Sequence, residues 1–202
     1  MRRLAILLCC SAVHAADGRL FFSKVFPGSV PEYVGITVES NGAVEYKEAA
    51  DDDRPLKLQL TSEEAAEMFA LADKLDHFKR PLESPLKVAK MGMKTFRFES
   101  GGEKTEVSFN FSEDLDARAL ADCFERISET GQNYFSLEQA VEFDKLGVQR
   151  AILQFTIAME KKRIVSPQIF LPLLDRIAKN DSYMNMARTR AANLADAIRA
   201  AK

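Results

Sequence analysis

Few residues of this 202-residue chain are of types that do nucleophilic or metal chemistry. The chain has two histidines and three cysteines, and only His77 and Cys123 remain if the leader described below is removed. A zinc site made of His and Cys needs three or four ligands. One residue of each type cannot supply them, so we predict no metal and no cofactor.

His77 and Cys123 could in principle act together as base and nucleophile. Cys123 shares an apolar helical stripe with Leu120 and Phe124, where a cysteine usually packs as a small hydrophobe. His77 follows a predicted helix, where a protonated imidazole interacts favourably with the helix C-terminus. We therefore predict a core cysteine and a helix-end histidine.

Carboxylates are plentiful, but no pattern singles out a catalytic pair. Residues 51–53 are three consecutive aspartates, without the alternating ligands, glycine and distant glutamate of an EF-hand, so a solvated turn is favoured over a calcium site. The sequence also lacks the G-x-S-x-G, Walker and G-x-G-x-x-G patterns. A hydrolase or lyase that uses two carboxylates stays open as an alternative, because sequence spacing does not reveal their distance in space.

The segment 79–93 is the one locally basic stretch of an acidic chain, with Glu83 as its only acid. Its lysines and arginine could contact an anionic partner, and its methionines could adapt to a partner surface. The simpler alternative is a crossover loop with solvated lysines. The candidate partner-binding residues are Lys79, Arg80, Lys87, Lys90, Met91 and Met93.

Residues 1–15 have the features of an export signal. Arg2 and Arg3 precede the apolar run 4–13, and Val13-His14-Ala15 fits a small-x-small cleavage site. The run is too short to span a bilayer. Lipidation at Cys10 is a weaker alternative, because a small residue normally precedes the modified cysteine. We predict a periplasmic or secreted protein with no further membrane-spanning segment.

Cleavage would leave Cys123 as the only cysteine, so no internal disulfide is expected. It would remove two arginines and no acid, and the net charge would change from −2 to −4. A mildly acidic protein gives no electrostatic reason to expect binding to nucleic acid.

Residues 33–47 predict a β-hairpin. Val34, Ile36 and Val38 alternate with polar or small residues, as in a half-buried strand. A three-residue loop at 40–42 pairs Val38 with Val44 and Ile36 with Tyr46, which puts the apolar residues on one face. This register predicts a left-handed Gly42 in a bulge.

The remaining elements were predicted from period and capping signals. A strand at 56–60 precedes a helix that starts with a Thr61–Glu64 capping box. A second hairpin turns at Gly102-Glu103, which pairs Phe98 with Val107 and Phe96 with Phe109. Further helices are expected from Ser112 or Asp114 to a stop at Gly131, over 136–145 and 148–162, from Ser166-Pro167 onward, and over 182–200 with Asp181 as cap.

These elements predict an α+β fold: a small, mostly antiparallel sheet of two hairpins plus an extra strand, with two helices, followed by a C-terminal helical bundle. The predicted organisation is a signal peptide over 1–15, an α+β domain over 19–131, and a helical part over 132–202 that packs on it.

The stretch from Gly28 to Tyr46 resembles a family of exported bacterial domains of unknown function, with the signature G-x-C-P-x-Y-x-V-x-I followed by G-x-V-x-Y. The whole chain is similar to uncharacterised secreted bacterial proteins. The resemblance covers residues 26 to about 80 and implies an exported protein with this fold. Val30 stands where the family has its cysteine. The matching residues are Gly28, Pro31, Tyr33, Gly42, Val44 and Tyr46.

The function that these observations favour is an exported, cofactor-free domain that binds a protein or cell-envelope partner without catalysis. One alternative is the carboxylate enzyme, with its cleft between the sheet and the C-terminal helices. Another is a homodimeric envelope protein built through the Ala-rich last helix, although that helix could instead pack on the core of its own chain.

Overall fold

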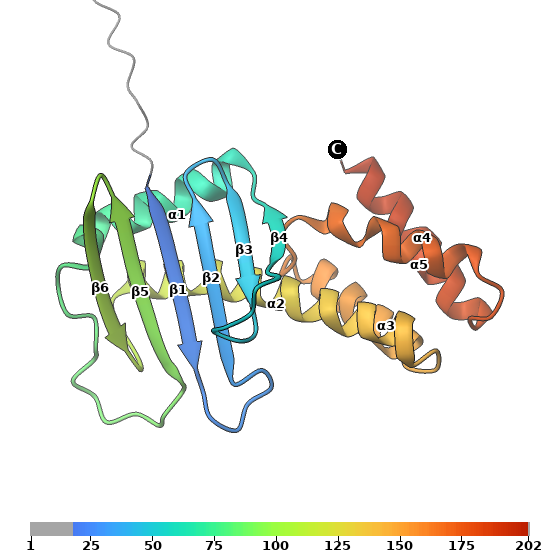
Figure 1. The fold of residues 1–202 in the computed structure, drawn as a ribbon, viewed down its shortest axis with the longest axis horizontal. Helices are drawn as coiled ribbons and strands as arrows, with labels where there is room; N and C mark the ends of the chain where they lie inside the picture. The colour runs from blue at the N-terminus through green and yellow to red at the C-terminus, as the bar shows by residue number, and fades with distance from the viewer. Residues whose placement is uncertain (1–17, 202) are drawn as a thin grey trace, which may run out of the picture.

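The computed structural model describes residues 18–201, so the predicted signal peptide lies outside the described residues. Six strands form one antiparallel sheet in the order β4-β3-β2-β1-β5-β6 (Figure 1). The predicted α+β class is confirmed. The strands are β1 (Arg19–Val25), β2 (Tyr33–Glu39), β3 (Ala43–Lys47), β4 (Leu56–Gln59), β5 (Met93–Ser100) and β6 (Glu103–Phe109).

Helices α1 and α2 cover one face of the sheet, and the last three α-helices lie beyond its β4 edge (Figure 1). The α-helices are α1 (Ser62–Lys74), α2 (Leu115–Phe143), α3 (Val148–Glu160), α4 (Leu171–Lys179) and α5 (Asn185–Ala200). Two short 3-10 helices, η1 (Asp76–Phe78) and η2 (Pro167–Phe170), follow α1 and precede α4.

The first hairpin has the predicted register. Val38 lies opposite Val44 and Ile36 opposite Tyr46, and all four side chains are buried. Gly42 has a φ of +84°, as the three-residue loop requires. The predicted capping box is also confirmed, because Thr61 and Glu64 bond each other's backbone N–H at the start of α1.

The second hairpin has a different register from the predicted one. Phe96 lies opposite Val107 and Phe98 opposite Thr105. The turn is Gly101-Gly102, with φ of +57° and +88°, and it joins paired residues Ser100 and Glu103. Two consecutive glycines allow a tight turn one residue earlier than predicted, which moves the pairing by two and leaves each side chain on its predicted face.

The sequence analysis missed β1, which is central to the sheet. It pairs with β2 on one side and β5 on the other. Leu20 and Phe22 face the core, whereas Phe21 between them is only half-buried on the open face. Three consecutive apolar residues hide the two-residue period, so the pattern did not identify the strand.

Helix α2 continues through the predicted stop at Gly131, so the prediction of two separate helices is wrong. A Cβ built on Gly131 would lie 2.3 Å from the ring of Tyr46. The glycine is there because the buried tyrosine of β3 occupies the space of a side chain, and it costs the helix about 1 kcal/mol relative to alanine. Asp114 caps the helix, in agreement with the prediction.

Two smaller predictions about helix starts are also wrong. Helix α5 begins at Asn185, and Asp181 pairs with Arg188 at 2.7 Å instead of capping. Ser166 does not cap η2; its hydroxyl bonds the backbone of Gln59 and so covers the outer edge of β4. The hydroxyl of Ser166 is therefore used in a contact with a distant segment and not in the cap that the local pattern predicts.

Two apolar cores share α2. Its first half packs Leu120 and Phe124 against the sheet and α1, and its second half packs Leu137 and Val141 against α3 to α5. One face of α5, formed by Ala187, Ala191, Ala195 and Ile198, is buried in the second core. The division into domains at residues 131 and 132 stays a prediction, and it falls within α2.

Candidate functional site

Two loops leave the sheet at the same end of β1. Val25, the last residue of β1, lies opposite Tyr33 of β2 and Met93 of β5. The loop 26–32 and the last part of the segment 79–92 therefore lie side by side at this end, below the strands in Figure 1, whereas Lys79 lies near Glu103 at the opposite end of β6. A Cβ built at Gly92 would lie 3.0 Å from Phe26 Cβ, so the two loops are in contact. We term this region the loop end.

Exposed apolar side chains concentrate at the loop end. Of the fourteen large apolar residues exposed within residues 18–201, seven belong to these two loops and their flanking strand ends. A cluster of this kind is usually a contact surface, because scattered single residues are the norm elsewhere on a protein. This loop-end patch consists of Val25, Phe26, Val30, Leu86, Val88, Met91 and Met93.

The predicted partner-binding residues divide into two groups. Lys79 lies 4.0 Å from Glu103, and Arg80 lies 2.5 Å from Asp114, whose pKa the guanidinium lowers. These two cations tie the segment to the domain. The other four residues are exposed like the first two but have no such ion pair among the described residues: Lys87, Lys90, Met91 and Met93.

The backbone of the basic segment forms hydrogen bonds with the side chains of Asn110 and Ser84. The Asn110 amide accepts a hydrogen bond from Met91 N at 2.7 Å and donates one to Ala89 O at 3.0 Å. Ser84 Oγ accepts from Leu86 N at 3.1 Å. With its backbone bonded to the domain and residues 85–91 all exposed, the segment displays its side chains outward in a fixed arrangement.

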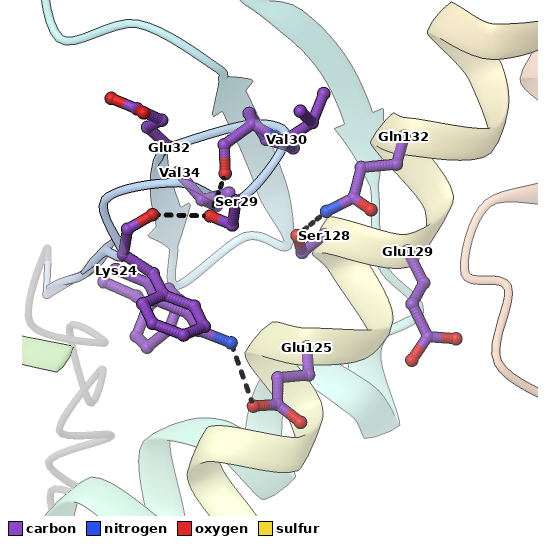
Figure 2. Close-up of a pocket in the computed structure, with 12 residues that line it drawn as sticks. Lys24, Ser29, Val30, Glu32, Val34, Glu125, Ser128, Glu129 and Gln132 are labelled. Atoms are coloured by element: carbon purple, nitrogen blue, oxygen red, sulfur yellow. Dashed lines mark hydrogen bonds and ion pairs between the residues drawn. The ribbon is translucent and has the colours of Figure 1, made fainter. Parts of the chain in front are cut away.

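A small pocket lies between the loop 26–32 and α2 (Figure 2). Its volume is about 290 Å³. Ser29 closes the loop because its hydroxyl lies 2.7 Å from the carbonyl oxygens of Phe26 and Pro31 and can donate its one proton to either, and Glu32 accepts from Gly28 N at 3.0 Å. Val30, which precedes a cis proline, is 97% exposed at the rim of the pocket. It thus belongs to both the pocket and the loop-end patch.

Two lysines lie next to each other at the inner side of the loop end. Lys24 and Lys94 are cross-strand partners, and Lys24 lies 4.0 Å from Glu125 of α2. Lys94 is buried and donates to Asn110 O at 3.1 Å. Burial, and then the positive charge of Lys24, lower the pKa of Lys94. The inner side of the loop end is therefore also locally basic.

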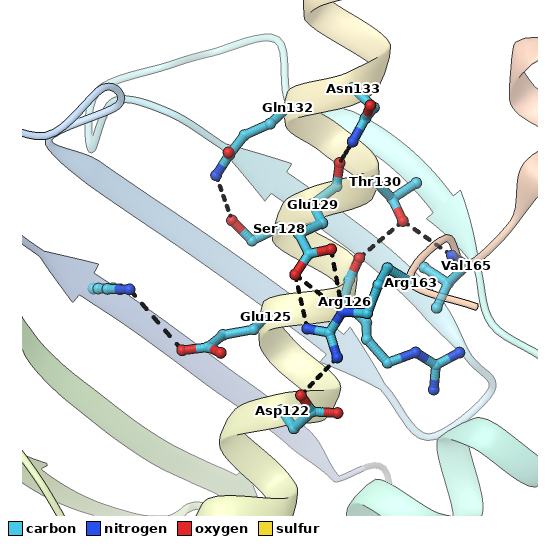
Figure 3. Close-up of polar contacts among 11 residues, drawn as sticks. Asp122, Glu125, Arg126, Ser128, Glu129, Thr130, Gln132, Asn133, Arg163 and Val165 are labelled. Atoms are coloured by element: carbon cyan, nitrogen blue, oxygen red, sulfur yellow. Dashed lines mark hydrogen bonds and ion pairs between the residues drawn. The ribbon is translucent and has the colours of Figure 1, made fainter. Parts of the chain in front are cut away.

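The carboxylates that α2 contributes beside the pocket lie next to cations (Figure 3). Arg163, from the segment after α3, donates to both oxygens of Glu129 and to Asp122. Glu125 has Lys24 as its neighbour. No apolar cavity with two facing acids, which the carboxylate enzyme would need, is formed by these residues. Their role in the structure is to join α2 to the strands and to the helical part.

The remaining candidates have structural contacts. His77 lies 2.7 Å from Asp73 and stacks on Phe98, and Cys123 is a half-buried free thiol beside the first core. Burial raises the pKa of Cys123 to about 11, which makes it a poor nucleophile. Within residues 18–201, no group of three or more His, Cys, Asp or Glu side chains could hold a metal ion.

Sequence reasoning missed five members of the loop-end patch: Val25, Phe26, Val30, Leu86 and Val88. Apolar residues at these positions look like core residues in a sequence, and only the fold shows that they are exposed. One signal was available. Pro85 and Gly92 bound the short stretch 86–91, which contains Lys87 and Lys90, and such bounding residues are typical of a loop.

Comparison with known protein families finds no family that matches this chain, and comparison with curated proteins finds no significant relative. The resemblance to the exported domain family therefore stays a hypothesis based on the residues quoted above. Among the described helices, none combines the length and the apolar character that crossing a bilayer would require.

Proposed function

We propose that this protein is an exported binding protein that attaches to a partner in the cell envelope through the loop-end patch. The observation that carries the proposal is the gathering of half of the exposed large apolar residues of residues 18–201 on two adjoining loops. The export signal predicted from residues 1–15 supports the location. The bonded backbone of the basic segment supports a preformed surface, which lowers the entropy cost of binding.

The contacts around the pocket favour binding over carboxylate catalysis. A general acid must be protonated when it acts, and desolvation in apolar surroundings is the usual means of achieving this. Glu125 and Glu129 instead lie beside Lys24 and Arg163, so neither carboxyl has apolar surroundings. The homodimer alternative gains no support from α5, because Ala187, Ala191 and Ala195 of this Ala-rich helix are already buried in their own chain.

The proposal is tested by sedimenting the purified protein with isolated cell envelopes. The test variant carries Leu86→Ser, Val88→Ser and Met91→Ser. The control carries Phe143→Ser and Leu146→Ser, because these side chains are 80% and 82% exposed on the helical part, away from the loop end. We expect the test variant to lose most of its envelope binding and the control to keep it. Equal sedimentation of the wild type and the test variant would overturn the proposal.

A further inference from the structure

We infer that the surface to which the loop-end patch binds is an anionic lipid bilayer. This inference rests on the proposed function and names the partner. It is based on the shape of the loop end, on the residue types that it exposes, and on the position of its charges.

The shape of the loop end suits a flat, deformable surface. The two loops extend beyond the ends of the strands (Figure 1), and five of the seven patch residues belong to these loops. The acidic loop that contains Asp51–Asp53 folds back beside the strands and does not extend as far. Projecting apolar side chains, such as Phe26 and Leu86, can enter the boundary between headgroups and acyl chains without a matching cavity in a partner.

The residue types favour lipid over protein as the partner. Protein interfaces are enriched in aromatic residues, Met and Arg but depleted in Lys, so the lysines of the patch, and not its methionines or its phenylalanine, point to lipid. The exposed cations of the patch are Lys87 and Lys90, and its apolar members are aliphatic residues, methionines and one phenylalanine. A lysine can lay its methylene chain along the apolar layer and place its ammonium group among anionic headgroups.

The charges of the loop end are arranged to attract anionic headgroups. Lys87 and Lys90 alternate with apolar residues in the exposed stretch 85–91. The two acids of the loops already accept hydrogen bonds from backbone N–H groups, Glu32 from Gly28 and Glu83 from Asn110. The net charge is −2 for the whole chain and −4 after the predicted cleavage, so the protein as a whole gains no attraction from an anionic membrane, and the exposed lysines of the loop end must supply it. The protein would therefore approach with the loop end first.

The strength expected of such an attachment is modest and reversible. Only loop tips enter the bilayer, so binding needs both the apolar side chains and the lysines. Removing either component should greatly weaken it. Added salt should weaken binding of the wild type, because the attraction between exposed charges is screened.

The experiment measures binding of the exported and processed protein to protein-free vesicles. One set is phosphatidylcholine alone, and the other contains about a quarter phosphatidylglycerol, which gives a negative surface. The variants are the triple serine variant at Leu86, Val88 and Met91, a charge variant with Lys87→Gln and Lys90→Gln, and the Phe143→Ser, Leu146→Ser control. All carry the same N-terminus, so the differences between them measure the loops alone.

We expect the wild type and the control to bind the anionic vesicles and to bind phosphatidylcholine at least tenfold more weakly. Each loop-end variant should bind the anionic vesicles about tenfold or more weakly than the wild type. Circular dichroism and urea unfolding should show that all variants are folded, because the changed side chains are exposed.

Two results would overturn the lipid inference: no binding of the wild type to anionic vesicles, or equal binding by the wild type and both loop-end variants. The wild type could fail to bind vesicles and still sediment with whole envelopes in a manner that depends on the loop residues. In that case the partner is a protein or a glycan. The proposed function then stands and the lipid inference fails. If sedimentation with envelopes is also unaffected by the loop changes, both fail.

Discussion

The two ends of the sheet are built from different kinds of residue. At one end, β2 joins β3 through Ser40-Asn41-Gly42, and β5 joins β6 through Gly101-Gly102. These turns consist of small and polar residues, with a positive φ at the glycines. At the loop end, the connections are longer and expose Val30, Leu86, Val88 and other apolar side chains.

The difference separates what folding requires from what it leaves free. The hairpin turns have the residues that their backbone geometry demands. At the loop end, the side chains of Asn110, Ser84 and Ser29 form hydrogen bonds with the backbone. The exposed apolar residues therefore contribute little to the conformation of the loops. Apolar residues that are exposed to solvent and have no role in folding are the best candidates for function.

Among the changes that test the difference between the two ends, substitutions of glycines are expected to have the largest effect on stability. Gly42 and Gly28 have φ of +84° and +85°, but a Cβ at Gly42 would lie 2.8 Å from Leu60 O, whereas a Cβ at Gly28 meets nothing within 4 Å. We expect Gly42→Ala to lower the free energy of unfolding by about 2–3 kcal/mol and Gly28→Ala by about 1 kcal/mol. Urea denaturation measures both, and equal losses would contradict the distinction between the two ends.

A smaller effect, of opposite sign, is expected at the buried lysine of the loop end. Lys94→Met removes a charge whose burial is unfavourable, so we expect it to raise the free energy of unfolding by about 1 kcal/mol at pH 7. Because the pKa of Lys94 is lowered from 10.5, the folded wild type loses this proton before the unfolded chain does. As the pH rises toward 10.5, the free energy of unfolding of the wild type should therefore increase relative to that of the variant.

The measurement is a series of urea denaturations of the wild type and Lys94→Met between pH 7 and about pH 10.5. Cys123, with its raised pKa of about 11, and Tyr46, whose pKa burial also raises, make stability fall over the upper part of this range. Both groups are present in both proteins, so the difference between the two curves isolates Lys94. A difference that stays constant with pH would show that Lys94 is not desolvated.

The smallest effect is expected for the loop-end patch itself. The Leu86→Ser, Val88→Ser and Met91→Ser variant changes only exposed side chains, and we expect each change to alter the free energy of unfolding by less than about 0.5 kcal/mol. The Phe143→Ser, Leu146→Ser control should behave in the same way. A loss of several kcal/mol in the loop variant would mean that these residues have a structural role, and would remove the contrast between the two ends.

The sequence by itself determined the first hairpin, the capping box of α1 and the α+β class. These features depend on local physics: Val38 and Val44 must share a face, Gly42 must adopt a positive φ, and Thr61 and Glu64 are close enough to cap one turn. It also identified the basic segment 79–93 as unusual, although it did not identify the apolar residues that accompany it.

The tertiary structure alone decided the continuity of α2, the strand β1 and the location of the loop-end patch. Gly131 reads as a helix stop until Tyr46 is seen to fill the space beside it. Leu86 lies in the segment 79–93 that the sequence singles out, but only the sheet places this segment and the loop of Val30 together at one exposed end. In each case the deciding contact joins residues far apart in the chain, and a pattern of neighbouring residues contains no information about it.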